Sequence, residues 1–123
     1  MGHNDELMRN KSAFASEMND AASILQYADS RSLVVLDELA RSTSTEEGVA
    51  ITYAICEKVL ALQCYTFLAT HFLDIAVLSN HSTAVENYHF QPYSDTTSTN
   101  QHHKLRVGPY RGPLYGKSRV NIY

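Results

Sequence analysis

The stretch Ser32-Leu33-Val34-Val35-Leu36-Asp37-Glu38 decides the fold class. It places four consecutive apolar residues directly before two carboxylates. A short run that is apolar at every position is typical of a central strand of a parallel sheet, covered by helices on both faces. The carboxyl end of such a strand is the edge at which open α/β sheets bind ligands. We therefore expect an α/β domain with Asp37 and Glu38 at a functional edge.

Patterns on either side extend this strand into a strand, helix, strand unit. Residues 12–27 carry apolar side chains at helical spacing, with Ser12 at the N-cap position. Overlapping capping boxes within residues 43–47 precede a second helix, which we expect to run to about residue 62. The aromatic and β-branched stretch 64–69 then predicts a second strand. A connection of this length joins parallel strands by a right-handed crossover.

Smaller elements are expected in the rest of the chain. The patterns predict a short helix over 72–78, a strand over 85–90, a polar loop over 91–101, a strand paired with the first over 102–107, and a turn over 108–113.

Composition excludes several classes of protein. The 123 residues, 44% hydrophobic and 19% charged, suit one domain with a modest core and not a disordered or collagenous chain. No apolar run approaches the roughly 18 to 20 residues that span a bilayer, and the first residues lack a signal peptide. We expect a nuclear or cytoplasmic protein without a membrane partner. Cys56 and Cys64 lie in apolar segments and are interpreted as core residues, and the six histidines lack the spacing of a zinc site.

Charge is distributed unevenly along the chain. Residues 1–95 hold five basic against thirteen acidic residues, a net charge of −8, whereas residues 96–123 hold five basic residues and no acid. This basic tail either meets phosphate groups or is an ordinary solvated strand and loop.

The acidic pair and a histidine have two interpretations each. Asp37 and Glu38 either turn a strand toward solvent or form a Walker B element, with Asp37 directed at a magnesium ion and Glu38 at the water that attacks a γ-phosphate. His71, just after the second strand, is either a hydrogen-bonded structural residue or a contact to that phosphate and water. Because parallel strands end at one edge, we expect these three side chains to converge.

Three motifs in the same order and spacing resemble the ATPase domain of MutS homologues. The resemblance covers about residues 8–90, and the turn at 108–116 is most similar to the meiotic branch of the family, MutS homologue four. We place a partial MutS-type ATPase domain at residues 1–110 and a divergent tail at 111–123. The motifs are Lys11-Ser12-Ala13-Phe14-Ala15-Ser16-Glu17-Met18, the stretch Ser32 to Gly48, and Phe67-Leu68-Ala69-Thr70-His71-Phe72.

This resemblance implies an ABC-type ATPase in which two subunits enclose ATP and Mg²⁺. It implies that Asp37 holds the magnesium ion and the nucleotide, that Glu38 is the general base and that His71 is a switch near the γ-phosphate. Ser12 matches the signature serine at a helix N-terminus, which reaches the nucleotide of the partner subunit. The implied partner is a second MutS homologue in a heterodimer, and the complete parent protein is implied to bind mismatched or branched DNA in the nucleus.

Two departures from the family pattern limit this expectation. The family has glycines where this chain has Ala40 and Ser42, and threonine where it has Ala13. The 123 residues also contain no G-x-x-x-x-G-K-[ST] phosphate-binding loop. We therefore expect a partial P-loop ATPase domain with a mostly parallel sheet flanked by helices, lacking the N-terminal P-loop half and inactive by itself.

Two alternatives remain open. The chain could be a non-catalytic interaction module that docks on a complete MutS-type partner through residues 12–18 and 39–48. It could also be a truncated product with exposed apolar sheet edges.

Overall fold

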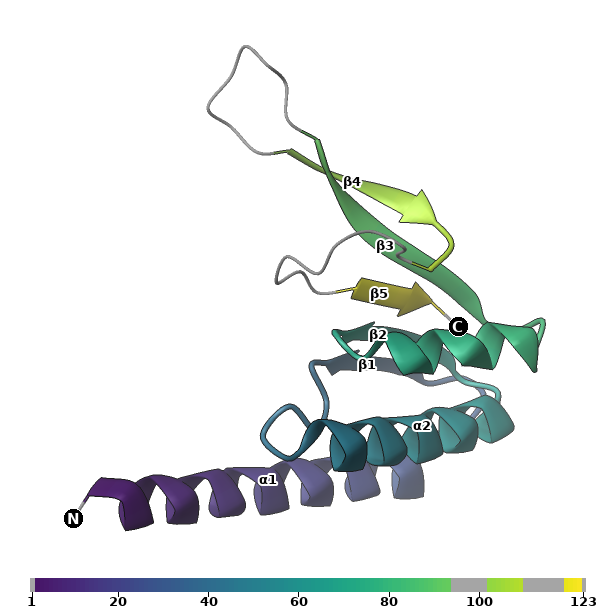
Figure 1. Cartoon of the computed structure of the whole chain (residues 1–123). Coiled ribbons are helices and arrows are strands. Elements are labelled where there is room, and N and C mark those ends of the chain that lie inside the picture. Colours follow the sequence, from purple (N-terminus) through teal and green to yellow (C-terminus); the bar gives the residue numbers. More distant parts are fainter. Residues whose placement is uncertain (1, 94–101, 110–118, 123) are drawn as a thin grey trace.

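Eight helices and strands make up the parts of the chain that the computed structural model describes, which are residues 2–93, 102–109 and 119–122 (Figure 1). In chain order they are α1 (Gly2–Tyr27), β1 (Leu33–Asp37), α2 (Thr45–Leu62), β2 (Tyr65–Thr70), the 3₁₀ helix η1 (Leu73–Asn80), β3 (Glu86–Tyr93), β4 (His102–Val107) and β5 (Arg119–Ile122).

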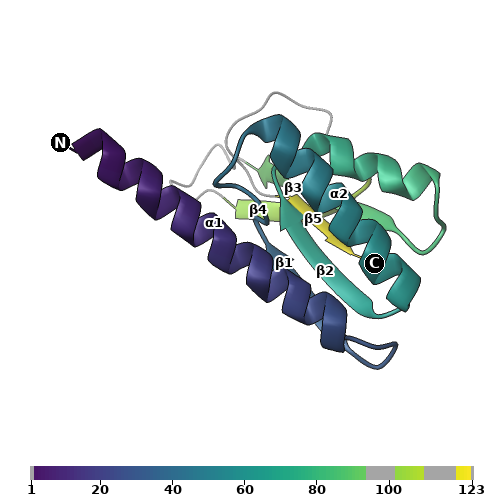
Figure 2. The same cartoon turned by 90° about the horizontal axis from the view of Figure 1, so that it is seen from below.

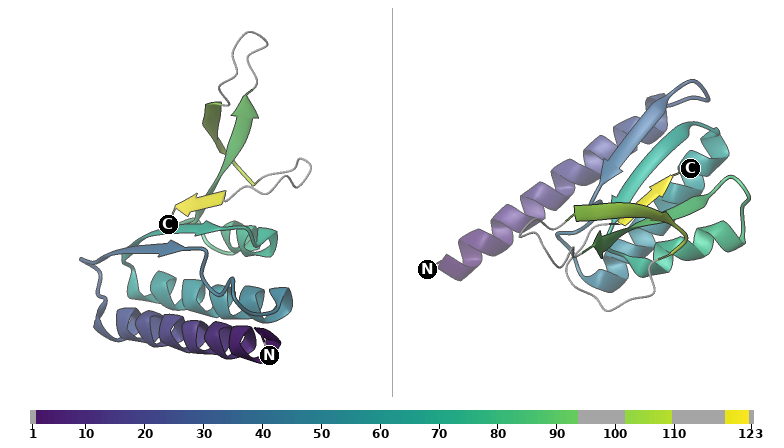
Figure 3. Two further views of the ribbon diagram at one scale, coloured as in Figure 1. Left: turned by 90° about the vertical axis from the view of Figure 1, so that its left-hand side faces the viewer. Right: turned by 90° about the horizontal axis from the view of Figure 1, so that it is seen from above.

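The expected strand, helix, strand unit is confirmed. Strands β1 and β2 pair in parallel, with Leu33 opposite Tyr65 and Asp37 opposite Ala69, and α2 forms the crossover between them. Helix α2 begins after the N-cap residue Ser44, whose hydroxyl accepts the Glu47 N–H, as the second of the two predicted capping boxes requires. Helices α1 and α2 lie on the same side of this strand pair (Figure 3).

The complete sheet has the order β1-β2-β5-β3-β4 and is mixed. Only β1 and β2 pair in parallel among the described strands, because β5 lies antiparallel between β2 and β3, and β3 pairs antiparallel with β4. The predicted pairing of 85–90 with 102–107 is confirmed, whereas a mostly parallel sheet is not. Strand β5 lies in the divergent tail, residues 111–123. The sequence predicted a turn over 108–113 and no helix or strand after it.

Helix α1 begins ten residues earlier than its sequence pattern predicted. Ser12 lies inside the helix, and its hydroxyl donates to the Arg9 carbonyl at 2.9 Å. A serine can satisfy its hydroxyl within a helix in this way, and the preceding residues, rich in Glu, Leu, Met, Arg and Lys, favour helix. The prediction that Ser12 is the N-cap is therefore wrong.

The core lies between the sheet and the helices on one side of it. Cys56 and Cys64 are both buried there as thiols and not as a disulfide, which confirms their interpretation as core residues. Packed with them are Ala21, Val34, Leu36, Leu39, Ala40, Val59, Leu68, Phe72, Ile75, Leu78 and Val85.

The opposite face of β1 and β2 is open. Burial alternates along both strands, so that every second residue points away from the helices. The expectation that both faces of β1 are covered is wrong for the described residues, since the helices pack against one side only. The open side carries apolar residues at 64% exposure for Leu33, 65% for Val35, 73% for Tyr65 and 40% for Phe67.

Candidate functional site

The carboxyl ends of β1 and β2 lie at the same edge of the sheet. Asp37 is the last residue of β1, and the Glu38 N–H continues the ladder by donating to the Ala69 carbonyl at 2.8 Å. Strand β2 ends at Thr70, directly before His71. The register therefore brings the residue after each strand to neighbouring positions.

Glu38 and His71 meet at this edge. The two side chains approach to 2.8 Å between His71 Nδ1 and Glu38 Oε2. An ionised carboxylate only accepts, so the imidazole N–H donates. Arg41 Nε lies 3.7 Å from the same oxygen. The Glu38 side chain is 19% exposed and the His71 side chain is 42% exposed. The expected convergence of Glu38 and His71 is confirmed, and their chemical roles stay predictions.

The loop after Asp37 has an unusual backbone. Glu38 has φ +52° and Ala40 has φ +59°, the left-handed region that favours glycine. Ala40 stands where the MutS-like pattern has a glycine, yet it adopts this conformation while fully buried. Each such residue costs about 1–2 kcal/mol. Ala40 therefore adopts a backbone conformation typical of glycine at an energetic cost.

Asp37 lies at this edge of the sheet, whereas Ser12 lies on helix α1. The Asp37 side chain is exposed and makes no hydrogen bond or ion pair within the described part of the chain. Ser12 is exposed in the N-terminal half of α1, which extends past the rest of the domain (Figure 2). The structure does not bring Ser12 to the other three predicted residues. Ser12 lies inside α1 and not at a helix N-terminus, so that basis for a contact with a partner's nucleotide is wrong, and the contact itself stays a prediction.

Phe72 fixes the backbone next to His71. Its ring lies where a side chain on Gly48 would be, 2.5 Å from an added Cβ, and its centroid is 4.2 Å from that of the His71 imidazole. The Phe72 N–H donates to the Thr70 hydroxyl at 3.1 Å. The start of α2 and the residue after β2 thus pack directly on each other.

Sequence reasoning missed two contacts of this edge. Arg41 is the cation beside Glu38, and Glu17 accepts a hydrogen bond from the Ala40 N–H at 2.9 Å. Position 41 follows the acidic pair by three residues, which is a usable signal. Glu17 lies 23 residues before its partner, and no local pattern indicates such a contact.

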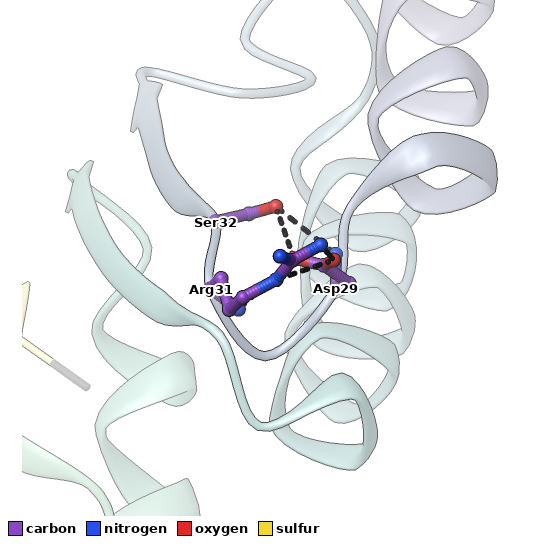
Figure 4. Close-up of polar contacts among 3 residues, drawn as sticks. All are labelled: Asp29, Arg31 and Ser32. Carbon is purple, nitrogen blue, oxygen red and sulfur yellow. Dashed lines mark hydrogen bonds and ion pairs between the residues drawn. The ribbon is translucent and has the colours of Figure 1, made fainter.

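A second polar cluster lies at the other end of β1 (Figure 4). Asp29 accepts hydrogen bonds from the Arg31 guanidinium and backbone N–H and from the Ser32 hydroxyl. The hydrogen bonds from Arg31 are the main reason that the pKa of Asp29 is lowered, and the hydrogen bond from Ser32 lowers it further. These contacts shape the turn that leads from α1 into β1.

Two kinds of feature do not occur in the parts that the structure describes. Residues 2–93, 102–109 and 119–122 contain no cluster of three or more His, Cys, Asp or Glu side chains that could hold a metal ion. No helix in these ranges is both long and apolar enough to cross a membrane.

Comparison with known proteins gives consistent matches. The family model described as MutS domain V matches residues 1–117. The chain is 75% identical to MutS protein homolog him-14 of Caenorhabditis elegans, over 99% of the chain and 14% of that relative. It is 42% identical to MutS protein homolog 4 of Homo sapiens, over 96% and 13%, and 40% identical to DNA mismatch repair protein MSH4 of Arabidopsis thaliana, over 94% and 15%. The chain spans about a seventh of the length of these curated relatives.

Proposed function

The chain belongs to the MutS family, and on this premise we propose that its Asp37, Glu38 and His71 edge is the γ-phosphate side of a composite ATPase site. The observation that carries the proposal is the 2.8 Å contact between Glu38 and His71 at the ends of adjacent parallel strands. An acidic residue and a histidine in this arrangement can hold and orient the water that attacks a phosphate.

Asp37 is the proposed ligand for Mg²⁺. This ion keeps several waters and takes phosphate oxygens, so that one or two protein carboxylates suffice. Asp37 meets that requirement because its exposed side chain makes no hydrogen bond or ion pair within the described residues. When bound, the ion neutralises charge that develops on the phosphate oxygens.

Glu38 is the proposed general base. Its carboxylate is held by the His71 N–H and by the nearby Arg41, so its orientation is set before substrate arrives. With the His71 Nδ1–H donated to Glu38, Nε2 of a neutral imidazole is left to accept a hydrogen bond from the attacking water. His71 would thus link that water to the loop that carries Glu38.

The complete activity requires groups that these 123 residues do not contain. No phosphate-binding loop occurs in the sequence, so we propose that the site functions within a larger ATPase domain and a MutS-type dimer. Ser12 would then meet the nucleotide of the partner subunit, with ATP turnover coupled to mismatched or branched DNA in the nucleus. The similarity to MutS protein homolog 4 favours a role in meiotic recombination.

A chimera tests the assignment of Glu38. This chain replaces the matching segment of MutS protein homolog him-14, and ATP binding and single-turnover hydrolysis are measured for the chimera and for its Glu38→Ala variant. We expect ATP binding to persist and hydrolysis to slow about a hundredfold or more, as loss of a general base implies.

Glu57→Ala is the matched control. Glu57 is an exposed carboxylate on α2, so its removal should leave both ATP binding and hydrolysis unchanged. Unchanged hydrolysis in the Glu38→Ala chimera would show that Glu38 is not the base.

The open face of the sheet favours a second candidate, an interaction module that docks on a MutS-type partner. Leu33, Val35, Tyr65 and Phe67 form a contiguous apolar surface, because Leu33 is opposite Tyr65 and Val35 is opposite Phe67. Sedimentation of the chain with a full-length MutS homologue should then show a complex that Val35→Asp weakens. A complex unaffected by this change would exclude the open face as the docking surface.

A further inference from the structure

Side chains from both helices hold the loop between β1 and α2. Glu17 of α1 accepts the Ala40 N–H through Oε1 at 2.9 Å. Thr52 of α2 donates its hydroxyl to the Leu39 carbonyl at 3.3 Å in a fully buried contact. The loop is therefore tied to α1 at one residue and to α2 at the residue before it.

The contact with Glu17 holds a conformation that the loop would not adopt by itself. Ala40 is fully buried and has φ +59°, and such backbone persists only where surrounding contacts determine it. A hydrogen bond to a charged acceptor is stronger than one between neutral groups. Without Glu17 the buried N–H would lose this acceptor, and the loop would relax toward an ordinary backbone conformation.

Any such relaxation would reach Glu38. Only Leu39 separates Glu38 from Ala40, and the Arg41 N–H donates to the Glu38 carbonyl at 3.2 Å across the same turn. Glu38 itself has φ +52°. A change at Ala40 therefore rotates the backbone that aims the Glu38 carboxylate at His71.

Glu17 also lies on the same helix as Ser12. They are five positions apart, which is about 7.5 Å at the 1.5 Å rise of an α-helix. Helix α1 is continuous from Gly2 to Tyr27, so the two residues move together. One rigid element thus carries the serine predicted to meet the partner's nucleotide and the carboxylate that holds the loop of Glu38.

We propose that Glu17 is a positioning residue that couples the position of α1 to the orientation of Glu38. The inference rests on the proposed function, since Glu38 must be the base for its orientation to matter. Glu17 is not itself assigned a contact with nucleotide or water. It acts through the Ala40 N–H, so that a displacement of α1 by the partner subunit changes the geometry of the site on its own subunit.

Two substitutions separate this role from a general structural one. Glu17→Ala removes the acceptor, whereas Glu17→Gln retains an amide oxygen that can accept the Ala40 N–H. The exposed Asp20 on the same helix supplies the matched control, Asp20→Ala. Amide hydrogen exchange of Ala40, taken relative to that of the core residue Leu68, is measured in the 123-residue chain, and single-turnover ATP hydrolysis is measured in the chimera.

Glu17→Ala is expected to speed relative exchange at Ala40 by about tenfold or more, the effect of losing one hydrogen bond to a charged acceptor. It should slow hydrolysis with ATP binding unchanged, and Glu17→Gln should recover most of both properties. Unchanged relative exchange in Glu17→Ala, or slowed hydrolysis without recovery in Glu17→Gln, would overturn the proposal. If Glu38→Ala does not slow hydrolysis, the proposed function and this coupling both fail, whereas the exchange data still decide whether Glu17 holds the loop.

Discussion

Both faces of the β1 and β2 pair carry apolar residues, and they differ in what covers them. Val34 and Leu36 pack beneath the helices, whereas Leu33 and Val35 of the same strand are open to solvent. A strand that is apolar on both faces can be buried on both, and in the described part of this chain helices cover one face. Stability should depend on the covered face, and association should depend on the open one.

The largest expected effect compares two leucines of β1. Leu36→Ala removes a buried side chain and should lower the free energy of unfolding by about 3 kcal/mol, within the range for such core truncations. Leu33→Ala truncates the same side chain on the open face and should change it by about 0.5 kcal/mol or less. Urea unfolding of both variants measures the difference, and equal losses would mean that the open face is covered in solution.

Gly48→Ala tests how tightly α2 packs against the loop and Phe72. An added Cβ would lie 2.5 Å from Phe72 Cζ and 3.0 Å from the Ala40 carbonyl oxygen, so we expect a loss of about 1–3 kcal/mol from overpacking. Thermal and urea unfolding measure it, and Phe72→Leu in the same chain should recover part of the loss. An increase of stability, as for an unhindered helical glycine replaced by alanine, would contradict this packing.

The cap of α2 is expected to matter less. Ser44→Ala removes the acceptor for the Glu47 N–H and should cost about 1 kcal/mol, as for other N-caps. Ser42, exposed in the preceding loop, supplies the control Ser42→Ala. If the two substitutions have the same effect on urea unfolding, the cap of the covering helix does not stabilise the domain.

The smallest expected effect concerns pH and the turn before β1. Hydrogen bonds from Arg31 and then Ser32 lower the pKa of Asp29 in the folded chain below its unfolded value. A lowered folded pKa stabilises the fold above the unfolded pKa, about 3.9 for Asp, and this stabilisation is lost as pH falls through the folded value. The stability difference between the chain and Asp29→Asn should therefore narrow from pH 7 to pH 3. A difference that is constant across this range in chemical unfolding would refute the linkage.

Local patterns predicted the elements near the site well. The strand before Asp37, the cap at Ser44 and the meeting of Glu38 with His71 follow from short-range signals and from the rule that parallel strands end together. The start of α1 was mispredicted because a serine that bonds to the carbonyl three residues before it looks like an N-cap in sequence.

Long-range features could not be derived from the sequence. Periodicity within an apolar run does not tell which face lacks a neighbour, so the open side of β1 was missed. Strand β5 pairs with β2 and β3, which are distant in sequence. No local pattern in residues 119–122 indicates these partners. The Glu17 contact with Ala40 likewise depends on how α1 packs on the loop.

The most direct test is a double-mutant cycle between Glu38 and His71, read by single-turnover ATP hydrolysis in the chimera. Residues that act as a unit have strongly non-additive effects. We predict that Glu38→Ala combined with His71→Ala slows hydrolysis little more than Glu38→Ala alone. Multiplicative effects of the two substitutions would show that the pair does not act together at the phosphate and would contradict the proposed site.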